Sequence, residues 1–176
     1  MSPKDDNPMG GKLPSSTLYE VIAKLCTSMR AMDTAREFRV FVPPPAAAAT
    51  DSETPKNFKI SAISQYKWPF VFEAPWGFTL EETVAKVETG AKAVLQEIVT
   101  YAKEELTADI VELLLKHGFS FDVALEQHGN VSLVEINPFG ALSGCGAFLF
   151  NWVLDGRVHY GLEEAQFAVA LDEVGE

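Results

Sequence analysis

The sequence predicts an α+β domain in which helices pack against an antiparallel sheet. Two alternating runs flank the turn-forming His-Gly-Asn sequence at 128–130, which is typical of a β-hairpin. Two segments with apolar residues at helical spacing each begin with a capping box, Thr17 with Glu20 and Thr79 with Glu82. With 176 residues, of which 47% are hydrophobic, the chain is long enough for one domain and too short for two ordinary ones.

The amino-terminal part is expected to hold a tail, a helix and a strand. Residues 1–14 are polar and rich in Gly and Pro, which is typical of a disordered tail. The helix after Thr17 places its apolar residues on one face: Leu18, Val21, Ile22, Leu25 and Met29. Arg36 to Val42 then alternates as a strand, with one face made of Phe38, Val40 and Val42 and the other of Glu37, Arg39 and Phe41.

The middle of the chain predicts a loop, a return strand and two helices. Residues 43–57 begin with three prolines and are of low complexity, so they are expected to form an exposed loop before a strand at 58–65. Apolar spacing predicts a long helix over 80–106, in which Gly90 is a candidate kink. A shorter helix over 107–116 ends at Gly118, a left-handed stop. Residues 161–176 are expected to form an acidic tail.

Charge and composition exclude several classes of function. The net charge of −11 and the pI near 4.7 argue against binding to nucleic acid or to anionic membranes, because both attract basic patches. No apolar run is long enough to span a bilayer, and the polar opening lacks the core of a signal peptide, so a cytoplasmic location is expected. Cys26 and Cys145 lie far apart and are expected to be reduced, packed thiols.

The hairpin over 121–139 places acids together. A two-residue loop at His128-Gly129 would pair Leu125 with Ser132 and Asp122 with Glu135, and Asn137 falls on the same face as Glu135. Its other face would carry the apolar residues Phe121, Val123, Leu125, Val134 and Ile136. Directly opposite carboxylates destabilise a sheet unless something compensates their charge. A divalent cation would do so, and these oxygen ligands suit magnesium, manganese or calcium rather than zinc.

Two alternatives to the metal site stay open. Asp122 and Glu135 could tolerate each other on a solvated sheet face, where water screens the repulsion. A three-residue loop would pair Asp122 with Ile136 and turn Glu135 to the opposite face, which would remove the site.

Five pieces of the chain resemble, in order, the cell division cycle protein 123 family. They are Glu37-Phe38-Arg39-Val40-Phe41-Val42, Ile63-Ser64-Gln65, Phe121-Asp122-Val123, Glu135-Ile136-Asn137-Pro138-Phe139-Gly140 and Phe148-Leu149-Phe150-Asn151-Trp152. That family has an ATP-grasp fold, and its best-known members are ATP-dependent assembly chaperones that dock on the gamma subunit of translation initiation factor two. The resemblance implies a partial, truncated ATP-grasp-like domain over 15–160, because the family carries a longer portion before the Glu-Phe-Arg strand.

Carried over by position, the resemblance makes Asp122, Glu135 and Asn137 ligands of a magnesium ion that holds ATP. Arg39 would contact phosphate, to which its planar fork is suited, and the alternative for Arg39 is an ion pair with a nearby carboxylate. The family usually has Asp where this chain has Glu135. The sequences Ser143-Gly144-Cys145-Gly146 and Gln65-Tyr66 also depart from the family's pattern.

The expected function is a Mg-ATP-binding assembly chaperone or protein-binding factor. An ATP-grasp ligase that forms an acyl phosphate is one alternative, and a truncated pseudoenzyme that serves as a binding module is the other. No histidine lies in a recognisable triad motif with Ser or Cys, so the sequence identifies no catalytic residue and leaves enzymatic activity undecided.

Overall fold

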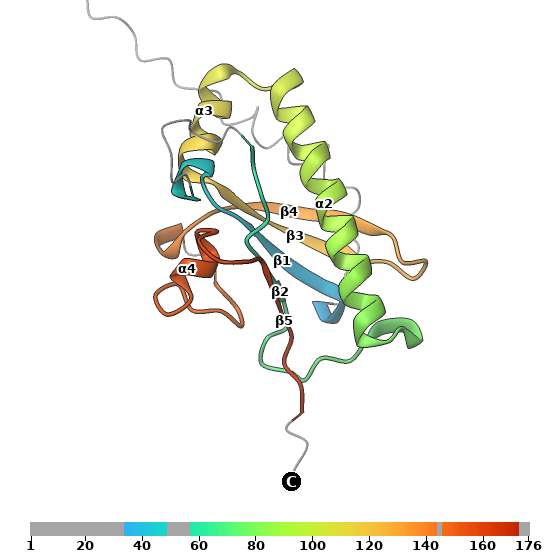
Figure 1. The fold of residues 1–176 in the computed structure, drawn as a ribbon. Helices are drawn as coiled ribbons and strands as arrows, with labels where there is room; N and C mark the ends of the chain where they lie inside the picture. The colour runs from blue at the N-terminus through green and yellow to red at the C-terminus, as the bar shows by residue number, and fades with distance from the viewer. Residues whose placement is uncertain (1–33, 49–56, 144–145, 173–176) are drawn as a thin grey trace, which may run out of the picture.

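The computed structural model describes residues 34–48, 57–143 and 146–172, and in them the chain forms one five-stranded sheet. The strand order is β4-β3-β1-β2-β5 (Figure 1). The bounds are β1 Glu37–Val42, β2 Ala62–Gln65, β3 Phe119–Leu125, β4 Val131–Pro138 and β5 Gln166–Ala168. Neighbours from β4 to β2 are antiparallel, and β5 is parallel to β2. The α+β class is confirmed, whereas the expectation of a wholly antiparallel sheet is corrected, because the sheet is mixed.

Helix α2, Leu80–Glu105, crosses one face of the sheet (Figure 1). Its predicted capping box is present: the Glu82 backbone N–H donates to the Thr79 hydroxyl, and the Thr79 N–H donates to the Glu82 carboxylate. Helix α3, Ala108–His117, ends before Gly118 as predicted, but the φ of 68° and ψ of −173° of this glycine are not the left-handed helical conformation; they lie in a region that glycine alone readily adopts. The described part of the chain also holds α4, Gly156–His159, and four 3₁₀ turns: η1 Thr34–Arg36, η2 Pro45–Ala48, η3 Pro75–Gly77 and η4 Ala141–Ser143.

A hydrophobic cluster lies on each face of the sheet. The larger cluster lies between the sheet and α2 and includes Phe38, Val40 and Val42 of β1, which confirms the predicted face of that strand. On the opposite face, Phe41 packs with Val158 and with aromatic residues from the segment after β4. Arg39 and Phe41 therefore belong to the second face, which carries polar groups near Arg39 and aromatic rings near Phe41.

Two expectations about the loop and the carboxyl-terminal segment need correction, and three others lie outside the described residues. The segment 161–172 is not only an acidic tail, because it contains β5, and Phe167 of β5 packs beside Phe38 in the larger cluster. The loop 43–57 is not exposed throughout, because Pro43 and Pro45 are buried. The tail 1–14, the helix after Thr17 and both cysteines fall outside the described residues. Among the helices that are described, none combines the length and apolar character needed to cross a membrane.

Gly90 marks a close approach between α2 and β4 rather than a kink. α2 continues through this position without interruption, and a Cβ added at Gly90 would overlap the side chain of Val131. We expect Gly90→Ala to lower the free energy of unfolding by about 1–3 kcal/mol, the usual cost of overpacking, although alanine is the better helix former. Urea denaturation measures this loss. Gly156→Ala is the control, since a Cβ there meets no atom within 4 Å; equal stability of both variants would contradict the close approach.

Candidate metal and phosphate site

The predicted hairpin forms, and its register near the acids is confirmed. Asp122 of β3 lies opposite Glu135 of β4, but Leu125 pairs with Val131 rather than with Ser132. The predicted two-residue loop is therefore wrong, and the register shifts by one residue between Asp122 and Val123, where Val134 is the extra residue of a β-bulge. The bulge restores the pairing of the acids. Because of the bulge, the residues of β4 that pack on the larger cluster are Val131, Leu133 and Ile136. The predicted apolar face, which had Val134 with Ile136, is therefore wrong at Val134.

Polar residues form one row across four strands. Arg39 of β1 lies opposite Ser64 of β2 on one side and opposite Asp122 of β3 on the other, and Asp122 lies opposite Glu135 of β4. Asn137 falls on the same face of β4 as Glu135, and its amide reaches both carboxylates. The structure thus brings together all four residues that the sequence proposed for the site.

A buried, two-pronged ion pair joins Arg39 to Asp122. The Arg39 Nε and Nη2 atoms donate to the two oxygens of Asp122, each at 2.7 Å. Arg39 is 4% exposed and Asp122 is fully buried. An ion pair with a carboxylate was the alternative role predicted for Arg39, and the structure identifies Asp122 as that carboxylate. Since the residues are 83 positions apart, the adjacency of β1 and β3 decides this contact.

Glu135 and Asn137 form the accessible side of the site. The Glu135 side chain is 48% exposed, and its Oε1 lies 3.6 Å from Arg39 Nη2. Asn137 Nδ2 donates to Glu135 Oε1 at 2.9 Å and, at 3.4 Å, to Asp122 Oδ2. The predicted repulsion between Asp122 and Glu135 is therefore already offset by one guanidinium and one amide group.

The two carboxyl groups differ in their affinity for protons. Burial raises the pKa of Asp122 to about 7, and its interaction with Glu135 raises it too, whereas Arg39 lowers it. Burial also raises the pKa of Glu135, but the hydrogen bonds to Asn137 and Asp122 and the charge of Arg39 outweigh it, so the net shift is downward. A proton near neutral pH thus goes first to Asp122, which is the usual behaviour of two close carboxyl groups.

An aromatic pair that the sequence did not indicate as part of the site covers Arg39. The Phe148 ring lies 4.4 Å from the guanidinium carbon, and the rings of Tyr66 and Phe148 are 4.7 Å apart. The Gly146 carbonyl accepts from Arg39 Nη1 at 3.4 Å, and the Leu149 N–H donates to Ser64 Oγ at 3.2 Å. These contacts hold the segment after β4 on the polar row. The segment from Phe148 to Trp152 is one of the five pieces that resemble the family, but no local feature of its sequence predicts a contact with Arg39.

The donor set is limited to two carboxylates and one amide. Within the residues that the structure describes, no three side chains of the types His, Cys, Asp and Glu are grouped as a metal centre would require. A cation at this site would therefore need Asn137, water or a ligand's own oxygens to complete its coordination. Magnesium commonly binds in this way, through one or two carboxylates, several waters and substrate phosphates.

Comparisons with models of known protein families and with curated proteins return no match to this chain.

Proposed function

We propose that the chain binds a magnesium-nucleotide complex on the polar row. Asp122, Glu135 and Asn137 would hold the metal ion, and Arg39 would supply positive charge beside the phosphates. The observation that supports this best is the direct opposition of Asp122 and Glu135, with Asn137 and Arg39 on the same face of the sheet. A bulge that aligns these residues is a recurrent feature next to functional sites.

The residues present fit magnesium by chemistry and by access. The row offers a cation the carboxylate oxygens of Asp122 and Glu135, which magnesium prefers, and the Asn137 oxygen would join them once the amide nitrogen that now donates to both carboxylates turns away. Access lies on the Glu135 side, where half of that side chain meets solvent, while Arg39 keeps Asp122 in place from the buried side. When bound, the ion would neutralise phosphate charge. The protein itself orients the two carboxylates and keeps the Arg39 guanidinium in a fixed position, shielded from water.

By the family resemblance, the biological role proposed for this binding is that of an assembly chaperone or protein-binding factor that acts on the gamma subunit of translation initiation factor two. A ligase would release ADP only when a carboxylate and an amine are added, and a pseudoenzyme would bind no nucleotide. Nucleotide binding and ADP release therefore separate the three roles.

The test is thermal melting with Mg²⁺, ATP or both. A ligand that binds only the folded state adds about 2.7 kcal/mol at a hundredfold excess over Kd, so we expect an upward shift that needs both components. Glu135→Gln should abolish most of the shift because the carboxylate that meets solvent is lost. Glu126→Gln is the matched control, an exposed glutamate in the turn of the same hairpin.

Without ligand, Glu135→Gln should melt within a few degrees of wild type. Arg39 already compensates Asp122, and the side-chain carbonyl that Glu135→Gln introduces would accept from Asn137 as the carboxylate does. A shift with Mg-ATP that is equal in wild type and Glu135→Gln, or no shift in wild type at millimolar nucleotide, would reject the proposed site.

A further inference from the structure

Among the described residues, helix α2 lies toward one side of the sheet and leaves a groove beside it, with the residues of β1 and β2 beneath it buried. It packs on β3 and β4, at one side of the five-stranded sheet. A helix with its side chains is about 10 Å wide, and strands lie about 4.8 Å apart, so one helix covers roughly two strands. Beside it, toward β2 and β5, lies an open groove of about 530 Å³ that includes Ile63 and Gln166.

The groove has an apolar floor and a basic rim. The larger apolar side chains of its lining are Phe58, Ile60, Ile63, Leu95 and Val99. Lys59, Lys92 and Lys103 lie around it and are exposed, whereas Glu88 is the one carboxylate in its described lining. The chain as a whole has 25 acidic and 14 basic residues, so this surplus of lysine runs against the overall charge. A groove on the other side of α2 is lined, in the described part of the chain, by one lysine and one glutamate, Lys86 and Glu97, and so has no such surplus.

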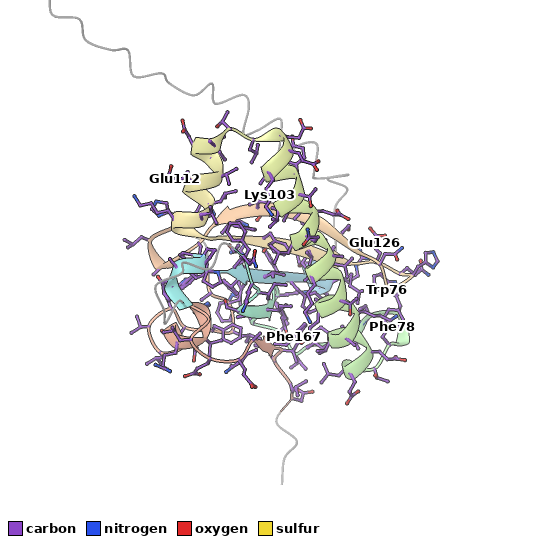
Figure 2. All side chains as sticks on the ribbon, turned by 45° about the horizontal axis from the view of Figure 1, so that its top comes forward. Trp76, Phe78, Lys103, Glu112, Glu126 and Phe167 are labelled. Atoms are coloured by element: carbon purple, nitrogen blue, oxygen red, sulfur yellow. The ribbon has the colours of Figure 1, made fainter. Side chains whose placement is uncertain are left out.

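The distance between Lys92 and Lys103 indicates what kind of ligand the groove could bind. Lys92 and Lys103 lie eleven positions apart on α2, which corresponds to about 16 Å along the helix axis. Lys103 is in the last turn of α2 (Figure 2). A ligand with a single anionic group cannot reach both lysines, but a helix with acidic residues about eleven positions apart presents both on one face, with apolar residues between them.

We propose that this groove binds an acidic amphipathic helix of a partner protein. The apolar side of the helix packs on the half-buried groove residues Phe58, Ile60 and Val99, and its acidic residues pair with Lys92 and Lys103. The proposal does not depend on nucleotide binding, because the groove is lined by residues on the face opposite to Arg39 and Asp122.

The test uses a labelled helical peptide of about 15 residues with leucines on one face and two glutamates about eleven positions apart on that face. Fluorescence anisotropy measures its binding to the full chain. We expect binding that weakens at least tenfold in Lys92→Glu and in Lys103→Glu. A peptide with lysines in place of the glutamates should prefer the Lys92→Glu/Lys103→Glu double variant. Lys116→Glu is the matched control, since Lys116 also lies in the last turn of a helix, but outside the groove.

Several results would overturn the proposal. If the acidic peptide does not bind, or binds equally to wild type and to both groove variants, the groove does not bind an acidic helix through Lys92 and Lys103. A dimer in sedimentation that Lys103→Glu converts to a monomer makes a second copy the occupant. Binding only after deletion of residues 1–33 makes that part of the chain the occupant.

Discussion

Arg39→Met is expected to lower the free energy of unfolding by about 3–5 kcal/mol, the usual cost of removing one partner from a buried ion pair. The variant leaves Asp122 buried without the two donors that hold it at 2.7 Å. Methionine fills a volume similar to that of arginine, so the loss of unfolding free energy is due to the missing positive charge and the two missing hydrogen-bond donors. Because burial already raises the pKa of Asp122 to about 7, the carboxyl of the variant can take up a proton, and the deficit should be smaller at pH 5 than at pH 8.

Urea denaturation of the double variant Arg39→Met/Asp122→Asn tests this explanation. Asparagine removes the buried charge, and Asn137 remains as a neighbour. The double variant should therefore be more stable than Arg39→Met alone at pH 8, since both partners of the pair are then neutral. If the two losses simply add, Arg39 and Asp122 contribute independently and the ion pair does not hold the row together.

Acid should destabilise the aromatic cluster around His159. Both ring nitrogens of His159 are buried and make no hydrogen bond to the described residues, and its ring stacks on Trp152 at 4.2 Å and meets the edge of Phe41. Burial lowers the pKa of His159 from 6.5 to about 4, against a smaller rise caused by Asp155. A group whose pKa is lower in the folded state binds its proton first in the unfolded chain. Its contribution is complete above pH 6.5 and is lost as the pH falls toward 4, by about 3 kcal/mol.

His159→Phe should remove this pH dependence, because phenylalanine keeps the ring contacts and cannot take up a proton. The difference in unfolding free energy between His159→Phe and wild type should grow in favour of the variant between pH 6.5 and 4. Carboxylates that titrate in this range do so in both proteins, so their contributions cancel in the difference between the two unfolding free energies. His128→Phe is the control, since His128 lies exposed in the hairpin turn. A constant difference across this range would show that His159 stays neutral or reaches water.

The sequence predicted the acidic pair for a partly wrong reason. Alternation and the turn residues identified the hairpin, and one register was assumed throughout it. The turn instead pairs Leu125 with Val131, and the bulge at Val134 returns Asp122 to Glu135. Local sequence predicted where the turn lies but not its length, and a bulge depends on packing on both faces of the strand, which single-strand periodicity does not report.

The elements that the sequence missed depend on contacts between distant segments. β5 has three residues and pairs in parallel with β2, about a hundred positions earlier, so it carries no hairpin signal and little alternation. The aromatic layer of Phe150, Trp152 and His159 over Phe41 has the same origin. In contrast, α2 and α3 were predicted closely, because capping, periodicity and the Gly118 stop are local.

Isothermal titration calorimetry of the full chain with Mg-ATP tests the central claim most directly. The polar row predicts saturable binding of one nucleotide that requires Mg²⁺, weakens at least tenfold in Glu135→Gln and is unchanged in Glu126→Gln. No heat of binding at millimolar nucleotide, or binding of equal strength in wild type and Glu135→Gln, would contradict the claim that Asp122, Glu135 and Asn137 hold a nucleotide-bound metal ion.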